Sequence, residues 1–310
     1  MIYCRNLQSI STQLNSTVVT IGNFDGIHAG HQRLLDELLN QATQRKASSL
    51  VLSFDPYPKE FFLGKRVPRL MSWREKFLFL QEQGIDYFVT VHFDKKFAQL
   101  TAEAFITEIL VKKLQAKKII VGDDFHFGAG RKGNYQLLRD LASRCDFEVM
   151  QLPMYEYLGE RVSSSRIRHT LQAGNMALAK ELLGHPYFLR GTVIHGNKLG
   201  RRLGFPTANI DLHRRLVPLS GVYVVRVTDI DAGVYGGVAN VGTRPAVQGT
   251  CSLLEVFIFD FNREIYGQTI KVEFLHKLRD EENFENLELL KEKIQQDVEA
   301  AIHVYGISKL

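Results

Sequence analysis

Residues 22–31 read Gly22-Asn23-Phe24-Asp25-Gly26-Ile27-His28-Ala29-Gly30-His31, and this stretch decides the fold of the first half of the chain. An apolar run at 17–21 predicts a buried strand before it, and leucines spaced three and four residues apart within 34–39 predict a helix after it. The N-terminus of a helix offers free N–H groups and a partial positive charge. His28 and His31 share one face of its first turn. The stretch therefore predicts a binding site for a phosphate chain.

The same residues carry a resemblance to a known family. They match the H-x-G-H signature of the nucleotidylyltransferases, and in their longer form they resemble the adenylyltransferase half of the prokaryotic bifunctional riboflavin kinase/FAD synthetases. The resemblance implies that His28 and His31 are catalytic. It also implies an ATP-binding role for five residues of the turn: Gly22, Asn23, Phe24, Asp25 and Gly30. The alternative is a glycine-rich turn with two surface histidines.

Length, composition and charge limit the classes of protein to which the chain can belong. A chain of 310 residues suits two domains, and a net charge of +5 fits anionic ligands such as nucleotides as well as a generic basic surface. No sustained basic arm predicts nucleic-acid binding. The three cysteines lie far apart, and neither a signal peptide nor a membrane-spanning run is evident. We expect a cytoplasmic protein, monomeric or weakly homo-oligomeric, with no membrane partner.

Strand and helix patterns alternate up to about residue 152. Further apolar runs predict four more strands, at 49–54, 86–91, 118–122 and 147–152. Alternation of this kind predicts a parallel sheet flanked by helices, a Rossmann-like α/β domain. In such sheets ligands bind beyond the carboxyl ends of the strands.

Two unusual loops follow strands of this predicted sheet. Asp55-Pro56-Tyr57-Pro58 comes after the second strand, and the loop 123–133 after the fourth is rich in glycine, aromatic and cationic residues. Such a loop suits a flat ring stacked on phenylalanine beside a phosphate, although a flexible surface loop is the alternative. It resembles the family signature G-x-D-F-x-F-G-x-x-R-x-G. The resemblance implies flavin binding by Asp55, Asp124, Phe125, Phe127 and Arg131.

One position departs from the family pattern. The family usually has D-P-H-P after the second strand, and Tyr57 stands here in place of the histidine. A role of that histidine cannot be carried over to this chain.

A third motif begins a helix at 162–168. Consecutive serines at a helix start are most often N-caps, but with Arg168 behind them they also form a second anion site. The segment resembles the family's S-S-T-x-I-R motif, with Ser165 in the threonine position. The resemblance implies phosphate binding by Ser164 and Ser165 and a catalytic role for Arg168.

The pattern changes at the predicted hinge 184–187, which gives predicted domains at 1–184 and 187–310. Six short strands follow in succession, at 188–194, 205–210, 222–227, 236–241, 253–261 and 269–275. They predict a closed antiparallel β-barrel, and a terminal amphipathic helix follows from 287.

Polar residues of the second half suggest a metal site. The stretch 191–198 lacks the Gly-Lys-Ser/Thr ending of a P-loop, although Gly196 and Lys198 remain phosphate-binding candidates. Thr207 and Asn209 lie two residues apart on a strand, so they face the same side, and their oxygens suit Mg²⁺. The alternative is a strand end with two hydrogen-bonded polar residues. The segment resembles the P-T-A-N hallmark of flavokinases.

Glu255 places a carboxylate inside an apolar strand, where it needs a partner or a purpose. A salt-bridged structural glutamate is one interpretation. In the flavokinase family this position holds the general base, so the resemblance implies that role for Glu255. Residues 237–245 also resemble the family, with Ala246 in place of the usual threonine.

The resemblance covers nearly the whole chain and implies two activities. The C-terminal domain would phosphorylate riboflavin with ATP to give FMN, and the N-terminal domain would transfer AMP from ATP to FMN, giving FAD and pyrophosphate, with Mg²⁺ as the metal. Two alternatives remain open. One is a different cytidylyl- or adenylyltransferase, which leaves the barrel motifs unexplained. The other is a non-catalytic flavin-binding sensor, which would not need a base at Glu255.

Overall fold

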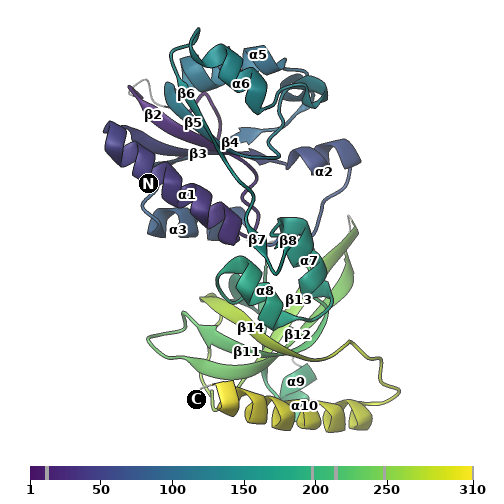
Figure 1. Ribbon diagram of the computed structural model, residues 1–310. Helices are drawn as coiled ribbons and strands as arrows, with labels where there is room; N and C mark the ends of the chain where they lie inside the picture. Colours follow the sequence, from purple (N-terminus) through teal and green to yellow (C-terminus); the bar gives the residue numbers. More distant parts are fainter. Residues whose placement is uncertain (11–13, 197–198, 213–215, 247–248, 309–310) are drawn as a thin grey trace. The chain divides into compact units, whose positions relative to one another are not determined.

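The structure is a computed structural model that describes residues 1–10, 14–196, 199–212, 216–246 and 249–308 (Figure 1). The chain divides into two compact units. The first unit comprises Met1–Val67 and Trp73–Ser163, and the second comprises Pro68–Ser72 and Ser164–Leu310.

A six-stranded parallel sheet forms the centre of the first unit, in the order β1-β4-β3-β2-β5-β6. The strands are β1 (Ile2–Cys4), β2 (Thr17–Ile21), β3 (Ser48–Asp55), β4 (Tyr87–His92), β5 (Ala116–Gly122) and β6 (Glu148–Leu152). The predicted α/β class is confirmed. β1 was not among the predicted strands, because three residues are too few to show a period. β2 lies inside the sheet and all of its residues are buried, which explains its unbroken apolar run.

Helices cover both faces of this sheet (Figure 1). The helical segments are α1 (Ala29–Arg45), α2 (Pro58–Leu63), α3 (Trp73–Glu82), α4 (Lys95–Ala98), α5 (Ala102–Ala104), the π-helix η1 (Phe105–Lys113), the 3₁₀-helix η2 (Ala129–Arg131) and α6 (Tyr135–Ala142). On one face, η1 and α6 contribute Phe105, Leu110 and Leu138 to a core that includes Val19 and Ile21 of β2. A small hairpin of β7 (Glu156–Tyr157) and β8 (Glu160–Arg161) closes the unit.

The second unit contains the predicted closed barrel, with strand order β10-β13-β12-β11-β14-β9 and antiparallel pairing throughout. Its strands are β9 (Phe188–Ile194), β10 (Thr207–Asp211), β11 (Gly221–Thr228), β12 (Tyr235–Ala246), β13 (Gly249–Ile258) and β14 (Thr269–Arg279). The helices are α7 (Ser164–Gln172), α8 (Met176–Leu183), α9 (Leu199–Leu203) and α10 (Leu287–Ser308). Barrel and terminal helix therefore agree with the sequence pattern.

The terminal helix α10 is held on the barrel by apolar and ionic contacts. Ala301 and Tyr305 pack with Val224 of β11. Near the middle of the helix, the Arg279 guanidinium donates to both oxygens of the Asp297 carboxylate, at 2.8–3.1 Å. This two-pronged pair is largely buried, so it fixes the helix direction more firmly than an exposed ion pair would.

Helices α7 and α8 belong to the second compact unit, although the sequence boundary at 184 assigned them to the first domain. α8 contacts β14, and its Ala179, Leu182 and Leu183 are fully buried. The boundary at 184 remains a prediction about independent folding.

We expect a fragment of residues 164–310 to melt at a higher temperature than a fragment of residues 187–310. Both contain the whole barrel and should fold, but the shorter one loses the burial of Leu182 and Leu183, and each buried leucine contributes about 1.5–3 kcal/mol. Thermal unfolding followed by circular dichroism measures the difference. Equal melting temperatures would show that α7 and α8 add nothing to the barrel, and an unfolded 187–310 fragment would contradict the predicted boundary.

Candidate functional sites in the two units

The turn between β2 and α1 has an unusual backbone. Phe24 and Ile27 adopt left-handed conformations, with φ of 48° and 38°, which bulky side chains rarely do. Both side chains are almost fully buried, so packing around them maintains a conformation that would otherwise relax. His28 is the N-cap of α1, and its Nδ1 accepts a hydrogen bond from the His31 backbone N–H at 3.4 Å.

This cap decides which nitrogen of His28 carries the proton. Because Nδ1 accepts, the hydrogen of the neutral ring is on Nε2. The His28 and His31 rings stack with centroids 3.7 Å apart, and a Cβ on Gly30 would approach the His28 ring to 3.4 Å. Glycine at position 30 therefore leaves space for the paired rings.

Both histidines are neutral at pH 7. Burial, aided by the nearby Arg161 charge, lowers the pKa of His28 to about 4. Burial and the charges of His28 and Lys76 hold the pKa of His31 well below its ordinary value. The Nδ1 atom of His31 has no hydrogen-bond partner within the described parts of the chain. An incoming anion would raise both pKa values, so the pair is suited to donate hydrogen bonds to phosphate oxygens.

Other predicted residues of the turn have different surroundings. The Asn23 side-chain oxygen is buried and lacks a hydrogen-bond partner in the described structure. Asp25 is 2% exposed, and its carboxylate accepts a hydrogen bond from the Tyr57 hydroxyl at 3.2 Å. A Cβ on Gly22 would lie 3.2 Å from the Phe24 ring. The Asp25 carboxylate is thus held by a buried hydrogen bond from Tyr57, and its ATP-binding role remains a prediction.

The loop after β5 is built around Phe127. Phe127 and Gly133 exchange two backbone hydrogen bonds, of 3.0 and 2.9 Å, and a Cβ on Gly133 would collide with the Phe127 ring. Phe125 stacks on Phe127 with centroids 5.2 Å apart. These bonds define the loop conformation after β5, where Phe127 is 8% exposed and packs in the core beside Phe105, while Phe125 is partly buried against that core.

The polar candidates for flavin binding lie at the carboxyl edge of the sheet. Asp55 ends β3, and Arg131 is exposed in the loop after β5. Asp124 forms an ion pair of 2.5 Å with Arg161. Sequence reasoning missed both Arg161 and the buried Lys76, since neither belongs to a recognisable spacing.

Ser164, Ser165 and Arg168 belong to the second unit, within α7. There, the Arg168 Nε donates to the Pro68 carbonyl at 2.7 Å. The structure does not place these residues together with His28 and His31. Their shared role at one site stays a prediction.

In the barrel, strand register brings three predicted residues together. Asn209 of β10 lies directly opposite Glu255 of β13, and Thr207 is two residues along the same face. On the other side of Glu255, Asn240 of β12 is its register partner. Val256 is fully buried and points to the opposite face. The carboxylate therefore stands in a polar row between two amide side chains.

Glu255 is half-buried, and burial raises the pKa of its carboxyl group. Among the residues that the structure describes, none forms an ion pair or a hydrogen bond with this carboxylate. The interpretation of Glu255 as a salt-bridged structural residue thus has no partner to support it. A carboxylate with a raised pKa is a stronger proton acceptor while it remains ionised.

Two adjoining pockets share Thr207 in their lining, and Glu255 is not among the described residues that line either of them. The larger, of about 530 Å³, is lined on one side by Thr207 and Pro206 and on the other by the loop 261–266. The smaller is lined by Gly196, Asn209 and Thr207. A Cβ on Gly196 would lie 2.3 Å from the Asn209 amide, so only glycine fits there. Lys198, the other phosphate candidate, lies outside the described residues.

The pocket's oxygen donors fit a hard cation. Thr207 and Asn209 offer neutral oxygens on one face, beside the Glu255 carboxylate. The described residues contain no cluster of three His, Cys, Asp or Glu side chains suited to a metal. Mg²⁺ commonly binds through one or two protein oxygens together with substrate phosphates and waters, which agrees with this donor set.

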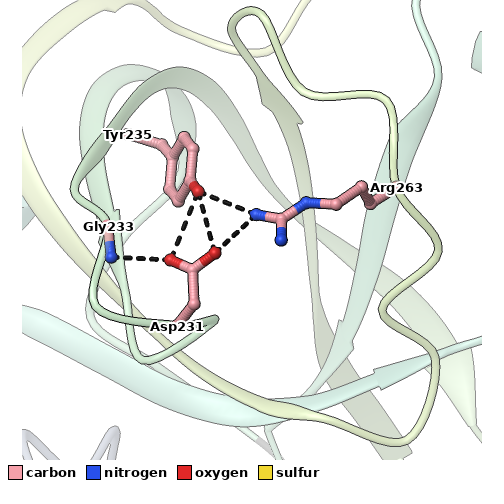
Figure 2. Close-up of polar contacts among 4 residues, drawn as sticks. All are labelled: Asp231, Gly233, Tyr235 and Arg263. Carbon is pink, nitrogen blue, oxygen red and sulfur yellow. Dashed lines mark hydrogen bonds and ion pairs between the residues drawn. The ribbon is translucent and has the colours of Figure 1, made fainter.

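A polar cluster anchors the loop that lines the larger pocket. The Asp231 carboxylate accepts hydrogen bonds from the Gly233 N–H, the Tyr235 hydroxyl and the Arg263 guanidinium (Figure 2). Arg263 also donates to the Tyr235 oxygen at 2.8 Å and covers the Phe261 ring. The turn between β11 and β12 is thereby tied to the loop 261–266.

The two units thus define a class of protein. The first has a nucleotidyl-transfer type of site at a strand-to-helix turn, and the second is a barrel with a carboxylate beside oxygen donors for a cation. Comparison with known proteins agrees. A family model for FAD synthetase matches residues 10–166, and one for riboflavin kinase matches residues 183–305.

Several relatives are similar along nearly the whole chain. The bifunctional riboflavin kinase/FMN adenylyltransferase of Haemophilus influenzae is 44% identical over 96% of this chain and 97% of its own. That of Escherichia coli K12 is 43% identical over 94% of each chain. The chain belongs to the bifunctional riboflavin kinase/FMN adenylyltransferase family.

A solved structure is also similar in fold. The crystal structure of a protein described as a macrolide-efflux protein from Streptococcus pneumoniae has a TM-score of 0.80, with 35% identity over 96% of each chain. In the described part of the present chain, none of the helices has both the length and the apolar character to cross a membrane.

Proposed function

We propose that the chain catalyses the two reactions for which its family is named, in succession. The C-terminal domain phosphorylates riboflavin with ATP to give FMN. The N-terminal domain transfers AMP from a second ATP to FMN, which gives FAD and releases pyrophosphate. The observation that carries this proposal is the pairing of two family matches, at 10–166 and 183–305, with a distinct set of chemical groups in each.

Adenylyl transfer needs alignment more than activation. The FMN phosphate is already a nucleophile at neutral pH, so the enzyme has to orient it and stabilise charge on the α-phosphoryl group of ATP. His28 and His31 would donate hydrogen bonds there, next to the N-terminus of α1. Arg168, Ser164 and Ser165 are proposed to add a second set of donors.

The kinase reaction needs a base. Its nucleophile is a neutral ribityl hydroxyl, and Glu255 is proposed to accept the proton as the bond to the γ-phosphorus forms. Thr207 and Asn209 are proposed to hold Mg²⁺, which would neutralise charge on the ATP phosphates. ATP-dependent transferases of this kind generally use a divalent metal, and the oxygen donors support Mg²⁺.

Flavin binding in the first unit is assigned to the loop after β5 and to the end of β3. Phe125 would stack on the ring system with the buried Phe127 packed behind it, and the proposed polar contacts are Asp55, Asp124 and Arg131. We further propose a cytoplasmic location, where ATP is supplied and the free thiols Cys4 and Cys145 stay reduced. A monomer or weak homo-oligomer is proposed for the assembly.

Two alternatives explain less. A different nucleotidylyltransferase would need no barrel with a Thr207, Asn209 and Glu255 face. A non-catalytic flavin sensor would have no use for a half-buried carboxylate that lacks a described partner.

Replacement of His28 separates the two activities. His28→Ala should lower the rate of FAD formation from FMN by on the order of 10²–10³, because it removes a donor that stabilises charge in the transition state. Phosphorylation of riboflavin by the same preparation should persist because it takes place in the second unit, and a thermal melting curve checks that the first unit is folded. Chromatographic assay of FMN and FAD gives both rates. Equal loss of both activities in a folded variant would contradict the assignment.

Replacement of Glu255 should have the reverse effect. Glu255→Gln keeps shape but removes the base, so kinase turnover should fall by roughly 10²–10⁴, while FAD formation from supplied FMN persists. Glu273→Gln is the matched control: this glutamate of β14 pairs with Arg226 and Lys271, so its loss should lower the melting temperature and leave kinase turnover intact. A stable Glu255→Gln variant with full kinase activity would refute the role of Glu255.

A further inference from the structure

Helix α3 brings an ammonium group into the interior of the first unit. Lys76 is only 4% exposed. Its Nζ donates to the backbone oxygen of Asn23 and lies 3.5 Å from the Ser53 hydroxyl and 3.4 Å from that of Tyr57. A buried charge is costly unless several partners satisfy it, so these contacts define where the lysine is held. One of its anchors is the backbone of the turn between β2 and α1.

Tyr57 connects this lysine to a carboxylate. The tyrosine is 4% exposed, and its hydroxyl donates to Asp25 at 3.2 Å. A phenol oxygen can accept one hydrogen bond while its own hydrogen is donated, so the same hydroxyl accepts from Lys76. The ring also lies 5.1 Å from the Lys76 Nζ, in a cation–π contact. The Lys76 ammonium, the Tyr57 hydroxyl and the Asp25 carboxylate form one buried hydrogen-bond network.

The two ends of this hydrogen-bond network contact the turn on either side of Phe24. Lys76 holds the carbonyl of Asn23, and Tyr57 holds the side chain of Asp25. Phe24, between them, is one of the left-handed residues of the turn. Its ring lies 5.0 Å from that of His31. A shift at either anchor would therefore move the residue that packs on the histidine pair.

We propose that Tyr57 is a positioning residue for adenylyl transfer, whose hydroxyl couples Lys76 to Asp25 and thereby fixes the backbone that orients His28 and His31. The proposal rests on adenylyl transfer at this turn. It also accounts for the departure from the family pattern, because a neutral histidine at position 57 has one donor and one acceptor nitrogen, as the tyrosine hydroxyl has one donor and one acceptor role.

The test compares Tyr57→Phe with Tyr57→His in the full-length protein. Tyr57→Phe keeps the ring and removes only the hydroxyl, so kcat for FAD formation from FMN should fall by about tenfold, with a smaller change in KM. Tyr57→His should recover kcat to within about threefold of the original protein, because it can restore a donor and an acceptor. Riboflavin phosphorylation in the second unit should be unchanged in both, and an unchanged melting temperature of the first unit shows that each variant is folded.

A double-mutant cycle tests the coupling itself. Lys76→Met and Tyr57→Phe act on one network, so the combined variant should be no slower than the slower single variant. Additive losses in kcat would overturn the coupling through the hydroxyl. A Tyr57→Phe variant with a lower melting temperature but full kcat, or a Tyr57→His variant no better than Tyr57→Phe, would overturn the positioning role. An unmodified protein that forms no FAD would instead overturn the functional assignment.

Discussion

The first unit depends on a helix that begins at a histidine. The Nδ1 atom of His28 caps α1, so the ring is fixed in place and its other nitrogen carries the proton. That arrangement exists only because the preceding residues take left-handed conformations, which burial of Phe24 and Ile27 maintains. Local backbone conformation and ring orientation are therefore linked, and burial of the two stacked rings lowers their pKa values and keeps them neutral.

The two sites meet different chemical demands with different electrostatics. A phosphate nucleophile needs donors that tolerate its charge, and we propose that the neutral imidazoles at a helix N-terminus supply them. A hydroxyl nucleophile needs a proton acceptor, and we propose the carboxylate whose pKa is raised by burial for that role. Asn209 and Asn240 flank Glu255 in register and add no opposite charge that would weaken it as a base. Each unit thus holds groups suited to a single step.

Sequence pattern predicted the features that depend on local periodicity. Alternation of strand and helix patterns predicted the parallel sheet, and strands in direct succession predicted the barrel. Two-residue spacing placed Thr207 and Asn209 on one face, and strand register sets Asn209 opposite Glu255. Contacts that tertiary folding creates were not predictable. Lys76 lies in a helix whose sequence gives no reason for burial, and Tyr57 was visible only as a departure from the family. Arg161 and the Asp231 cluster join segments far apart in sequence, without a spacing that marks them.

The central claim is that one chain performs both reactions in order. Purified full-length protein incubated with riboflavin, ATP and Mg²⁺, and sampled over time by chromatography, tests this most directly. FMN should appear first and FAD should follow as FMN accumulates, and omission of ATP should stop both. Absence of FMN, or FMN that accumulates without any FAD while ATP remains, would contradict it.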